Sequence, residues 1–406
     1  MNDHSERPLD LYPPLRDKRF PFDPPPEFMR RQREQPVSRM RLWDGGEAWV
    51  ITRYVEGRAV LADERFSADP RRPGFPEKNI AYANTIGKDR NVRTLDNPEH
   101  DSQKRMMVRD FTVKRVDEIR PYVQSLVDKL IEEMKEHGPP FDVIPGFAVT
   151  LPTMVICELL GVSYHEREFF GHRAKAVLAA HTADEALTAG NELNDFIEKL
   201  IDAKIAAPEN DLISRLAHEQ MLKGNLERSQ LVSIGRLMLI AGHDTTAGMI
   251  GLSIPLLLTR PEPLAELRAS DDPAFVKNAV DEMLRYLGSV HGGRRRVAIT
   301  DVEIGGQLIR ANDGVIVMNN VMDRDESVFP NAGQLDFHRP NTRDHVAFGF
   351  GIHQCLGQLL ARMELQVVHA TLWKRMPTLR LAVPLSELDF MEEGSNYEVR
   401  SVPVAW

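Results

Sequence analysis

The chain has 406 residues, of which 42% are hydrophobic and 27% are charged, and its formal net charge at pH 7 is −9. This composition is that of an ordinary soluble globular protein. The net negative charge argues against a nucleic-acid-binding protein, whose binding surface is basic. Because the chain has only two cysteines, Cys157 and Cys355, both a disulfide scaffold and a four-cysteine zinc site are excluded.

The N-terminal segment is rich in charged residues and proline and has no apolar stretch that could act as an export signal. Its prolines cluster between positions 13 and 26, which predicts an extended, loosely held arm over residues 1–45. The least charged stretch, residues 245–259, is shorter than the roughly 20 residues that a membrane span requires. We therefore expect a cytoplasmic protein that has no membrane segment.

The elements that follow the arm are mainly helical. Residues 48–53 predict a strand and residues 56–62 a short helix. Helical patterning then dominates residues 102–260. In residues 123–134, for example, apolar side chains recur at the three-to-four spacing of one helical face. A strongly apolar helix is predicted over residues 231–258.

The pattern changes in the last third of the chain. Residues 297–304 and 308–317 alternate in polarity and contain β-branched residues, and Gly305 and Gly306 between them predict a hairpin. Helical patterning returns at residues 356–372. Helices without regular strand–helix alternation indicate an α+β fold class that is mainly α, with minor β-hairpins.

The two cysteines lie in different surroundings. Cys157 lies in an apolar helical segment, which favours a packing role. Cys355 lies among Gly349, Gly351 and Gly357, directly before a helix. Glycines here allow left-handed turns and the close approach of a flat ligand, and backbone N–H groups at a helix N-terminus favour a thiolate. Such a thiolate is a soft ligand for iron; the alternative is a glycine-rich turn that happens to hold a cysteine.

The run Phe348-Gly-Phe-Gly-Ile-His-Gln-Cys-Leu-Gly357 resembles the haem-binding loop of the cytochrome P-450 family, and the resemblance extends over roughly residues 49–406. It implies one wedge-shaped cytochrome P-450 domain over residues 1–406 that binds haem b, iron protoporphyrin IX. It further implies that Cys355 is the axial thiolate ligand of the iron. Phe348 is then expected to pack near the sulfur, and His353 to reach a haem propionate.

A second set of residues matches an ion network of the family. Glu282 and Arg285 stand at i and i+3 of a predicted helix, a pair that by itself is a common surface feature of small energetic value. By the resemblance, these two residues pair with Arg339, which stands nine residues before Phe348. The implied role is structural: a buried three-member network that fixes the loop under the haem.

The family's propionate ligands also have matches in the chain. His100 and Arg296 match two of them. Lys104 stands where the family usually has arginine, and it supplies a positive charge without the bidentate geometry of a guanidinium group. Arg294 and Arg295, beside Arg296, are alternatives for this contact or for contact with the substrate pocket.

Residues 241–246, Ala-Gly-His-Asp-Thr-Thr, interrupt the apolar helix predicted over residues 231–258. Hydroxyl side chains compete for backbone hydrogen bonds, so we expect a local opening of the helix here. The alternative is a helix N-cap or a buried kink. Asp244 in such an apolar stretch is costly unless it is partnered or hydrated. By the resemblance, Asp244 and Thr245 organise a water chain that delivers protons to dioxygen at the haem.

The resemblance implies a haem-thiolate monooxygenase that uses dioxygen to hydroxylate or epoxidise an apolar small molecule. No flavin or iron–sulfur domain is evident, so electrons are expected from NAD(P)H through a separate ferredoxin reductase and a ferredoxin. The candidate residues of the substrate pocket are Ile240, Ala241, Val290 and Gly293. A basic patch near the thiolate is the predicted docking site of the ferredoxin, and its members are Lys104, Arg105, Arg109, Lys114, Arg115, Arg343 and Arg362.

Features of the sequence disfavour three alternative functions. A haem-thiolate nitric oxide reductase of the same fold takes hydride directly and needs no oxygen-activating acid, so Asp244 and Thr245 disfavour it. A non-catalytic haem-binding protein, such as a gas sensor, is disfavoured because no second domain is evident that could transmit a signal. A cysteine hydrolase that uses Cys355 with His353 is disfavoured because residues two apart around a turn are poorly placed to form a nucleophile–base pair.

Overall fold

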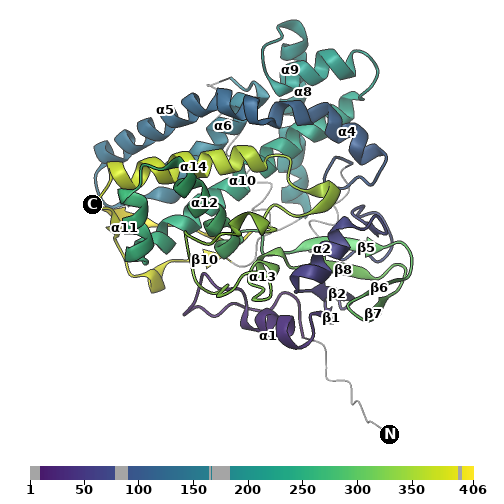
Figure 1. Ribbon diagram of the computed structural model, residues 1–406. Coiled ribbons are helices and arrows are strands. Elements are labelled where there is room, and N and C mark those ends of the chain that lie inside the picture. Colours follow the sequence, from purple (N-terminus) through teal and green to yellow (C-terminus); the bar gives the residue numbers. More distant parts are fainter. Residues whose placement is uncertain (1–9, 78–89, 164–165, 167–182, 392–395) are drawn as a thin grey trace.

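The computed structural model describes residues 10–77, 90–163, 166, 183–391 and 396–406. Figure 1 shows that helices make up most of the molecule and that the largest sheet lies beside them together with α2. The helices are α1 (Pro26–Glu34), α2 (Tyr54–Ala62), α4 (Glu99–Met107), α5 (Val113–His137), α6 (Thr150–Leu160), α8 (Ala183–Ala206), α9 (Leu212–Leu216), α10 (Arg228–Leu258), α11 (Pro261–Ala269), α12 (Pro273–Leu287), α13 (Asn319–Met322) and α14 (Gln358–Arg375).

The described strands form one larger sheet and three small ones. The five-stranded sheet has the order β1-β2-β8-β5-β3, the three-stranded sheet has the order β4-β12-β9, and β6 with β7 and β10 with β11 form two separate hairpins. The strands are β1 (Val37–Arg41), β2 (Glu47–Ile51), β3 (Phe66–Ser67), β4 (Phe141–Asp142), β5 (Arg294–Ala298), β6 (Val302–Ile304), β7 (Gln307–Ile309), β8 (Gly314–Val317), β9 (Arg380–Leu381), β10 (Phe390–Met391), β11 (Glu398–Val399) and β12 (Pro403–Ala405).

The main hydrophobic core lies between α5, α6, α10, α12 and α14. The apolar face predicted within residues 123–134 is buried on α5, where Val123, Val127 and Ile131 are fully inaccessible. Cys157 on α6 is buried in the same core, which confirms its predicted packing role. A second cluster fills the space between the five-stranded sheet and α2.

Helix α10 is the longest helix among the described residues and runs through the main core. By length and composition it could cross a membrane, with a mean hydropathy of 1.2 over its most apolar window. The stretch of residues 245–259 is itself shorter than a span, as expected, but the helix that contains most of it is long enough. However, 67% of that window is buried inside the molecule, which is the position of a core helix.

The expectation of an extended arm over residues 1–45 does not hold for residues 26–41, which form α1 and β1. Pro26 stands in the first turn of α1, where a missing N–H costs nothing. The helix is tied to the body of the molecule because Gln32 Nε2 donates to the carbonyl oxygens of Thr52, at 2.8 Å, and Val321, at 2.7 Å.

The hairpin predicted from residues 297–317 is correct at its tip and wrong in its length. Gly305 and Gly306 connect β6 to β7 and both have positive φ, as a tight hairpin turn requires. However, each predicted strand breaks in two, and β5 pairs with β8 in the five-stranded sheet. At the break, the Asp301 carboxylate accepts hydrogen bonds from the Ala311 N–H, at 2.9 Å, and from Arg310, at 2.7 Å.

Candidate active site

The loop that carries Cys355 leads directly into α14 and is closed by its own backbone. The N–H of Cys355 donates to the carbonyl oxygen of Phe348 at 2.9 Å, and the N–H of Gly349 donates to that of Val346 at 2.8 Å. Gly349 and Gly351 have φ values of 79° and 74°, as expected for left-handed turns.

The glycines of this loop serve different purposes. A Cβ atom on Gly351 would lie 2.3 Å from the carbonyl oxygen of Leu61, at the end of α2. This close approach is therefore to the chain's own backbone and not to a flat ligand. Gly357 is the N-cap of α14 with a φ of −82°, so the expectation of a left-handed turn there is wrong.

Opposing effects act on the thiol of Cys355. Burial raises its pKa and is the largest effect, whereas the charge of Arg294 and the backbone N–H of Gly357 lower it. The backbone N–H therefore acts in the expected direction, towards the thiolate, while burial of the thiol acts more strongly in the opposite direction. A metal ion would deprotonate a coordinating thiol outright.

The side chain of Phe348 packs between two neighbours on the side of α14. The guanidinium carbon of Arg362 lies 4.4 Å from the centroid of the Phe348 ring, and the His345 ring centroid lies 5.7 Å from it. Arg362 is held in turn by Asp281, whose Oδ1 accepts a hydrogen bond from Arg362 Nε at 2.6 Å. The loop is thus clamped to α12 and α14 immediately before Cys355.

The structure brings together the four residues predicted to bind propionates. The rings of His100, on α4, and His353, on the loop, have centroids 4.5 Å apart. The Nζ of Lys104 donates to the carbonyl oxygen of Ile352. Arg296, on β5, is buried and acts electrostatically on both histidines. Four groups from three separated segments therefore converge beside the cysteine loop.

This convergence creates a site for an anion. Burial, followed by the charges of Arg296 and His100, lowers the pKa of His353 to about 2. Burial and the charge of Arg294 lower the pKa of Arg296 to about 10. The Nε2 atom of His100 is buried and has no hydrogen-bond partner in the described part of the chain. A ligand that carries carboxylates here would satisfy this nitrogen and offset the positive charge, as haem propionates would.

The donor set around Cys355 also fits a metal that brings its own ligands. Within the described ranges, no group of three or more His, Cys, Asp or Glu side chains could hold a metal ion. A metal bound through Cys355 therefore needs other donors, which the four nitrogens of a porphyrin supply. The residues present thus fit a haem with one protein ligand and anchored carboxylates.

The three adjacent arginines of β5 do not share one environment. Side chains alternate along a strand, so Arg294 and Arg296 lie on the side of the loop and Arg295 on the other. Arg294 Nη2 lies 3.4 Å from the carbonyl oxygen of Ala347, whereas Arg295 acts on Tyr12. This arrangement leaves Arg294 and Arg296, but not Arg295, on the side of the cysteine loop.

Helix α10 carries the predicted acid–alcohol pair. The Oγ1 of Thr245 donates to the carbonyl oxygen of Ala241 at 3.0 Å, and α10 continues without a break through this turn. The expected opening of the helix is therefore absent from α10. The hydroxyl group of Thr245 donates to the carbonyl oxygen of residue i−4, and the helix keeps its backbone hydrogen bonds. Asp244 is half-buried, and its carboxylate accepts a hydrogen bond from Asn396 Nδ2.

The candidate pocket residues differ in exposure. Ile240 and Val290 are half-buried, and Ala241 is exposed, one turn before Thr245 on α10. Gly293 instead packs against the five-stranded sheet: a Cβ atom there would lie 2.6 Å from the Cγ2 of Ile316. The structure therefore places Gly293 in a packing position.

Glu282, Arg285 and Arg339 form one buried ion network. Nε of Arg285 donates to Glu282 Oε2 at 2.7 Å, and Nε of Arg339 donates to the same oxygen at 3.1 Å. The three residues are 0%, 0% and 3% exposed. The remaining guanidinium nitrogens donate to backbone carbonyl oxygens, including that of Gln334, which accepts from both arginines. The network therefore ties α12 to the segment that precedes the cysteine loop.

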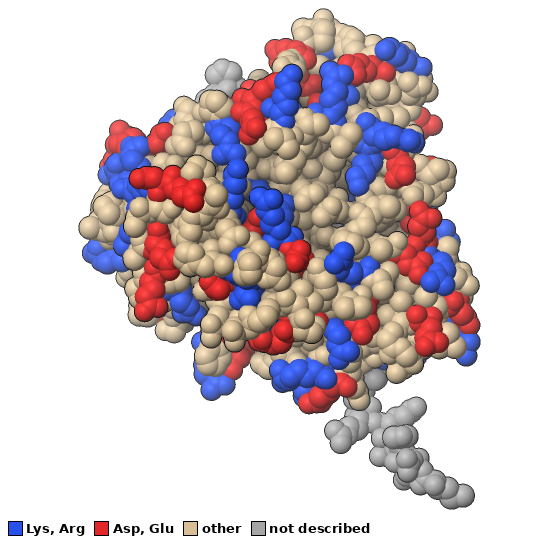
Figure 2. Space-filling view, in the orientation of Figure 1, with Lys and Arg blue, Asp and Glu red and all other residues tan. Residues whose placement is uncertain are grey.

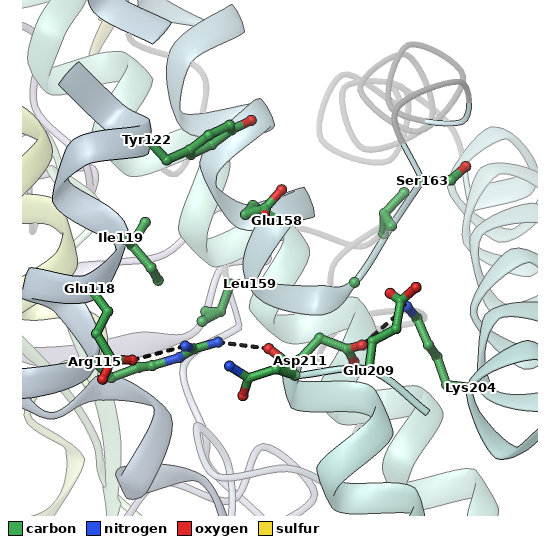
Figure 3. Close-up of a pocket in the computed structure, with 13 residues that line it drawn as sticks. Arg115, Glu118, Ile119, Tyr122, Glu158, Leu159, Ser163, Lys204, Glu209 and Asp211 are labelled. Carbon is green, nitrogen blue, oxygen red and sulfur yellow. Dashed lines mark hydrogen bonds and ion pairs between the residues drawn. The ribbon is translucent and has the colours of Figure 1, made fainter. Parts of the chain in front are cut away.

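A surface pocket of about 540 Å³ lies away from these residues, between α5, the end of α6 and the segment that joins α8 to α9. In Figure 3 its walls carry charges of both signs, with Lys204 beside Glu209 and Asp211 and Arg115 beside Glu118. These charges pair with one another, and neither Cys355 nor α10 lines the pocket. It is not part of the candidate active site.

Sequence reasoning did not single out Asn396 as a partner of Asp244. The two residues are 152 positions apart, and no local pattern connects a terminal turn with one turn of a core helix. The sequence also leads us to expect that substrate specificity resides around residues 73–95, 169–197, 287–295 and 392–397, because mobile, variable segments carry function. The first, second and fourth of these segments lie partly outside the described residues. Within these three segments, the structure describes residues 73–77, 90–95, 183–197 and 396–397, which include Asn396.

The chain is similar to known proteins of one family. A family model described as Cytochrome P450 matches residues 177–377. The chain is 46% identical over 387 residues to Cytochrome P450-SU2 of Streptomyces griseolus, covering 95% of this chain and 94% of that protein. It is 42% identical to Vitamin D3 dihydroxylase of the same organism, covering 91% of each. The crystal structure of GfsF superposes with a TM-score of 0.93 at 39% identity, covering 98% of this chain and 100% of that one.

Proposed function

The chain belongs to the cytochrome P450 family and is a haem b monooxygenase, and from this premise we propose that it hydroxylates or epoxidises an apolar small molecule. The electrons come from NAD(P)H through a ferredoxin reductase and a ferredoxin. In this proposal, residues 1–406 form a single domain, and the protein is located in the cytoplasm. The observation that carries it is the convergence of His100, Lys104, Arg296 and His353 beside the loop of Cys355.

Each of these residues has a part in holding the cofactor. Cys355 would supply the thiolate ligand of the iron, and the four basic groups would hold the propionates. When bound, the haem supplies the reductive activation of dioxygen that allows one oxygen atom to enter a C–H or C=C bond. The network of Glu282, Arg285 and Arg339 positions the loop and does not touch the cofactor.

On the side of α10, Asp244 and Thr245 hold and move protons. A carboxylate beside a hydroxyl group can pass a proton from bulk water to the reacting oxygen. The apolar residues that surround this turn on α10 exclude bulk water from the rest of the site. This acid–alcohol pair favours oxygen activation over direct hydride transfer to nitric oxide.

An apolar substrate is supported by the apolar side chains of the candidate pocket residues Ile240 and Val290 and by the name of one relative. Vitamin D3 dihydroxylase, 42% identical to this chain, is named for an apolar polycyclic substrate. We therefore propose the same broad substrate class, apolar metabolites, for this protein.

The proposal is tested first on the metal ligand. The reduced carbon monoxide adduct of the purified protein is expected to show the strongly red-shifted Soret band of thiolate ligation. Cys355→Ala and Cys355→His are expected to abolish this band, whereas Cys157→Ala, in the core, should retain it. Loss of the band in Cys157→Ala and its survival in Cys355→Ala would show that the ligand is misassigned.

The second test concerns catalysis. Apolar metabolites are first screened by substrate-binding difference spectra. The best binder is then incubated with dioxygen, NADH, a ferredoxin and its reductase, and the products are analysed by mass spectrometry. An oxygenated product that requires all components supports the monooxygenase. Binding spectra without product across the screened set would favour a non-catalytic haem-binding protein.

A further inference from the structure

The C-terminal hairpin lies directly against α10. Strands β10 and β11 pair in register, with Phe390 opposite Val399 and Met391 opposite Glu398. A Cβ atom on Gly248 of α10 would lie 3.3 Å from the Cγ of Glu398, so the glycine allows the strand to approach the helix closely. The hairpin therefore covers the part of α10 that follows Asp244.

Asn396 makes the second contact between the hairpin and α10. Its Nδ2 donates a hydrogen bond to Oδ2 of Asp244, and its side chain is 7% exposed. Asn396 stands two residues before Glu398, just ahead of β11, and Asp244 stands about one helical turn, about 6 Å, before Gly248 on α10. Asn396 and Glu398 therefore meet Asp244 and Gly248 as two successive steps along one interface.

The intervening residue fixes the position of Asn396. The N–H of Tyr397 donates to the carbonyl oxygen of Ser289 at 2.7 Å. The Tyr397 ring stacks on Phe390 with centroids 5.7 Å apart and an interplanar angle of 13°, and the guanidinium carbon of Arg16 lies 3.8 Å from its centroid. Asn396 therefore directly precedes Tyr397, a buried residue whose ring is packed against two neighbours, and this packing holds the Asn396 amide in position.

We propose that Asn396 is a positioning residue, which holds the carboxylate of Asp244 in the orientation needed for proton delivery. The inference rests on the proposed function, because it assigns to Asn396 the orientation of a group that function already uses. An amide donor bonded to one carboxylate oxygen restricts rotation of the Asp244 side chain. Loss of this donor loosens the orientation of the carboxylate, and the proton then reaches the reacting oxygen more slowly.

The test compares Asn396→Ala with the parent in the holoenzyme. Turnover is expected to fall about tenfold, part of the roughly 10²–10⁴ that a positioned proton-transfer group contributes, while more NADH is diverted to peroxide. The solvent deuterium isotope effect on turnover should rise, because proton delivery becomes more rate-limiting. The carbon monoxide spectrum should stay as in the parent, because Asn396 is assigned no contact with the haem. Turnover is compared at saturating substrate, with the dissociation constant of each variant measured from binding spectra, so that a change in substrate affinity does not enter the comparison.

A double-mutant cycle supplies a readout that does not depend on activity. Asn396→Ala and Asp244→Asn are combined, and the denaturation midpoint is measured for all four proteins. If the side chains interact, the double variant should be less destabilised than the sum of the single variants. Arg400→Ala is the matched control, because it breaks an exposed ion pair with Asp389 in the same hairpin and is expected to turn over like the parent.

The outcomes separate this inference from the proposed function. If Asp244→Asn turns over like the parent, the proton-delivery part of the proposed function fails and the inference fails with it. If Asp244→Asn is slow but Asn396→Ala turns over like the parent, only the inference is overturned. Equal losses in Asn396→Ala and Arg400→Ala would also overturn it, since they would reflect a loosened hairpin.

Discussion

Asp244 and Thr245 are neighbours in sequence, but their side chains are engaged in different ways. The hydroxyl group of Thr245 bonds within α10, to the carbonyl oxygen of Ala241. The carboxylate of Asp244 bonds outside the helix, to Asn396 on the terminal hairpin. Removing the hydroxyl group therefore breaks no tertiary contact described in the structure, whereas changing the carboxylate disturbs an interface between two elements.

We predict that Thr245→Ala binds substrate and accepts electrons but loses coupling. Without the hydroxyl group, protons reach the activated oxygen unproductively, so NADH consumption exceeds product and hydrogen peroxide accumulates. Stability should change little, because alanine is a good helix former. Thr245→Ser keeps the hydroxyl group and should remain coupled, whereas Asp244→Asn should mainly slow turnover. Measured ratios of product to NADH that are equal in Thr245→Ala and the parent would refute the role.

A second residue of interest is Asp323, which is fully buried beside the loop that leads to Cys355. Its Oδ1 accepts a hydrogen bond from the N–H of Val346 at 2.7 Å, but its Oδ2 is buried without a hydrogen-bond partner among the described residues. Burial raises the pKa of this carboxyl group to about 8, against the lowering effects of the Val346 N–H, Arg285 and Arg324. The ordinary value in an unfolded chain is about 3.9.

The raised pKa of Asp323 makes stability depend on pH in a defined direction. Between pH about 4 and about 8 the folded chain keeps a proton that the unfolded chain has released, so the free energy of unfolding falls as pH rises, on the order of a few kcal/mol in all. Asp323→Asn should remove this slope. Unfolding midpoints at pH 5 and pH 8 measure it, with the exposed Asp301→Asn as control; an unchanged slope in Asp323→Asn would contradict the assignment.

Single residues were predictable where their signal is local. Cys355 and His353 stand within one run of ten residues, so the sequence alone identifies the loop. Asn396 and Asp323 were not predictable, since their importance comes from partners 152 and 23 positions away. The opening expected at Thr245 was also wrong, because a hydroxyl group can bond to the i−4 carbonyl without disrupting the helix.

At the scale of elements, the cysteine loop is supported from two sides. The end of α2 touches it at Gly351, and α12 holds it through the ion network and through Asp281. The contact with α2 leaves no room for a side chain at Gly351, and it therefore fixes the distance between the loop and the end of α2. Gly349, two residues earlier, has the same left-handed backbone but nothing nearer than 3.8 Å to an added Cβ atom.

This difference allows a matched comparison of two variants. Gly349→Ala is expected to cost about 1–2 kcal/mol of stability, the price of a left-handed alanine. Gly351→Ala adds the collision with the Leu61 carbonyl oxygen and should be clearly less stable, with lower haem retention after purification. Thermal unfolding and the haem-to-protein ratio measure both effects. Equal stabilities and equal haem-to-protein ratios in the two variants would show that α2 moves to admit the methyl group and does not fix the position of the loop.

Elements with strong periodicity were predictable, and those that depend on side-chain bonds were not. The repeated apolar spacing gave the core position of α5. The split of the predicted long hairpin into two pairs coincides with the hydrogen bonds of the Asp301 carboxylate, and a polarity pattern cannot show those bonds. Likewise, proline clustering suggested an extended arm, although Pro26 is compatible with the first turn of α1.

At the scale of the whole molecule, the face in front of α14 is the proposed docking surface for the ferredoxin. In Figure 2, blue side chains surround a shallow hollow in the middle of this face. The members of the basic patch are not equivalent. Arg109 lies 3.4 Å from Glu219 and Arg115 lies 3.0 Å from Glu118, whereas the side chain of Arg343 is 78% exposed and lies 3.7 Å from Asp281.

Reduction by an acidic ferredoxin should depend on these charges. Rising salt, towards about 0.5 M, should slow it, because exposed charges are screened over a Debye length of about 10 Å at 0.1 M. Arg343→Glu and Arg109→Glu, at side chains that are 78% and 69% exposed, should each slow reduction more than Arg115→Glu, at a side chain that is 22% exposed. None of the three should alter substrate affinity. Stopped-flow reduction rates that do not respond to salt or to Arg343→Glu would place the docking site elsewhere.

The parallel pairing of β2 with β8 has a consequence for how the protein is made. Ile51 pairs with Val317, so β2 gains its partner only after 266 further residues have been synthesised. At about 5–20 residues per second on the ribosome, the β1–β2 hairpin waits from about 13 s to about 53 s with an open edge. Truncated chains that stop before residue 314 are expected to be cut by protease within residues 37–51 under conditions that spare the complete chain. Nascent chains of this protein therefore need protection at that edge until β8 emerges.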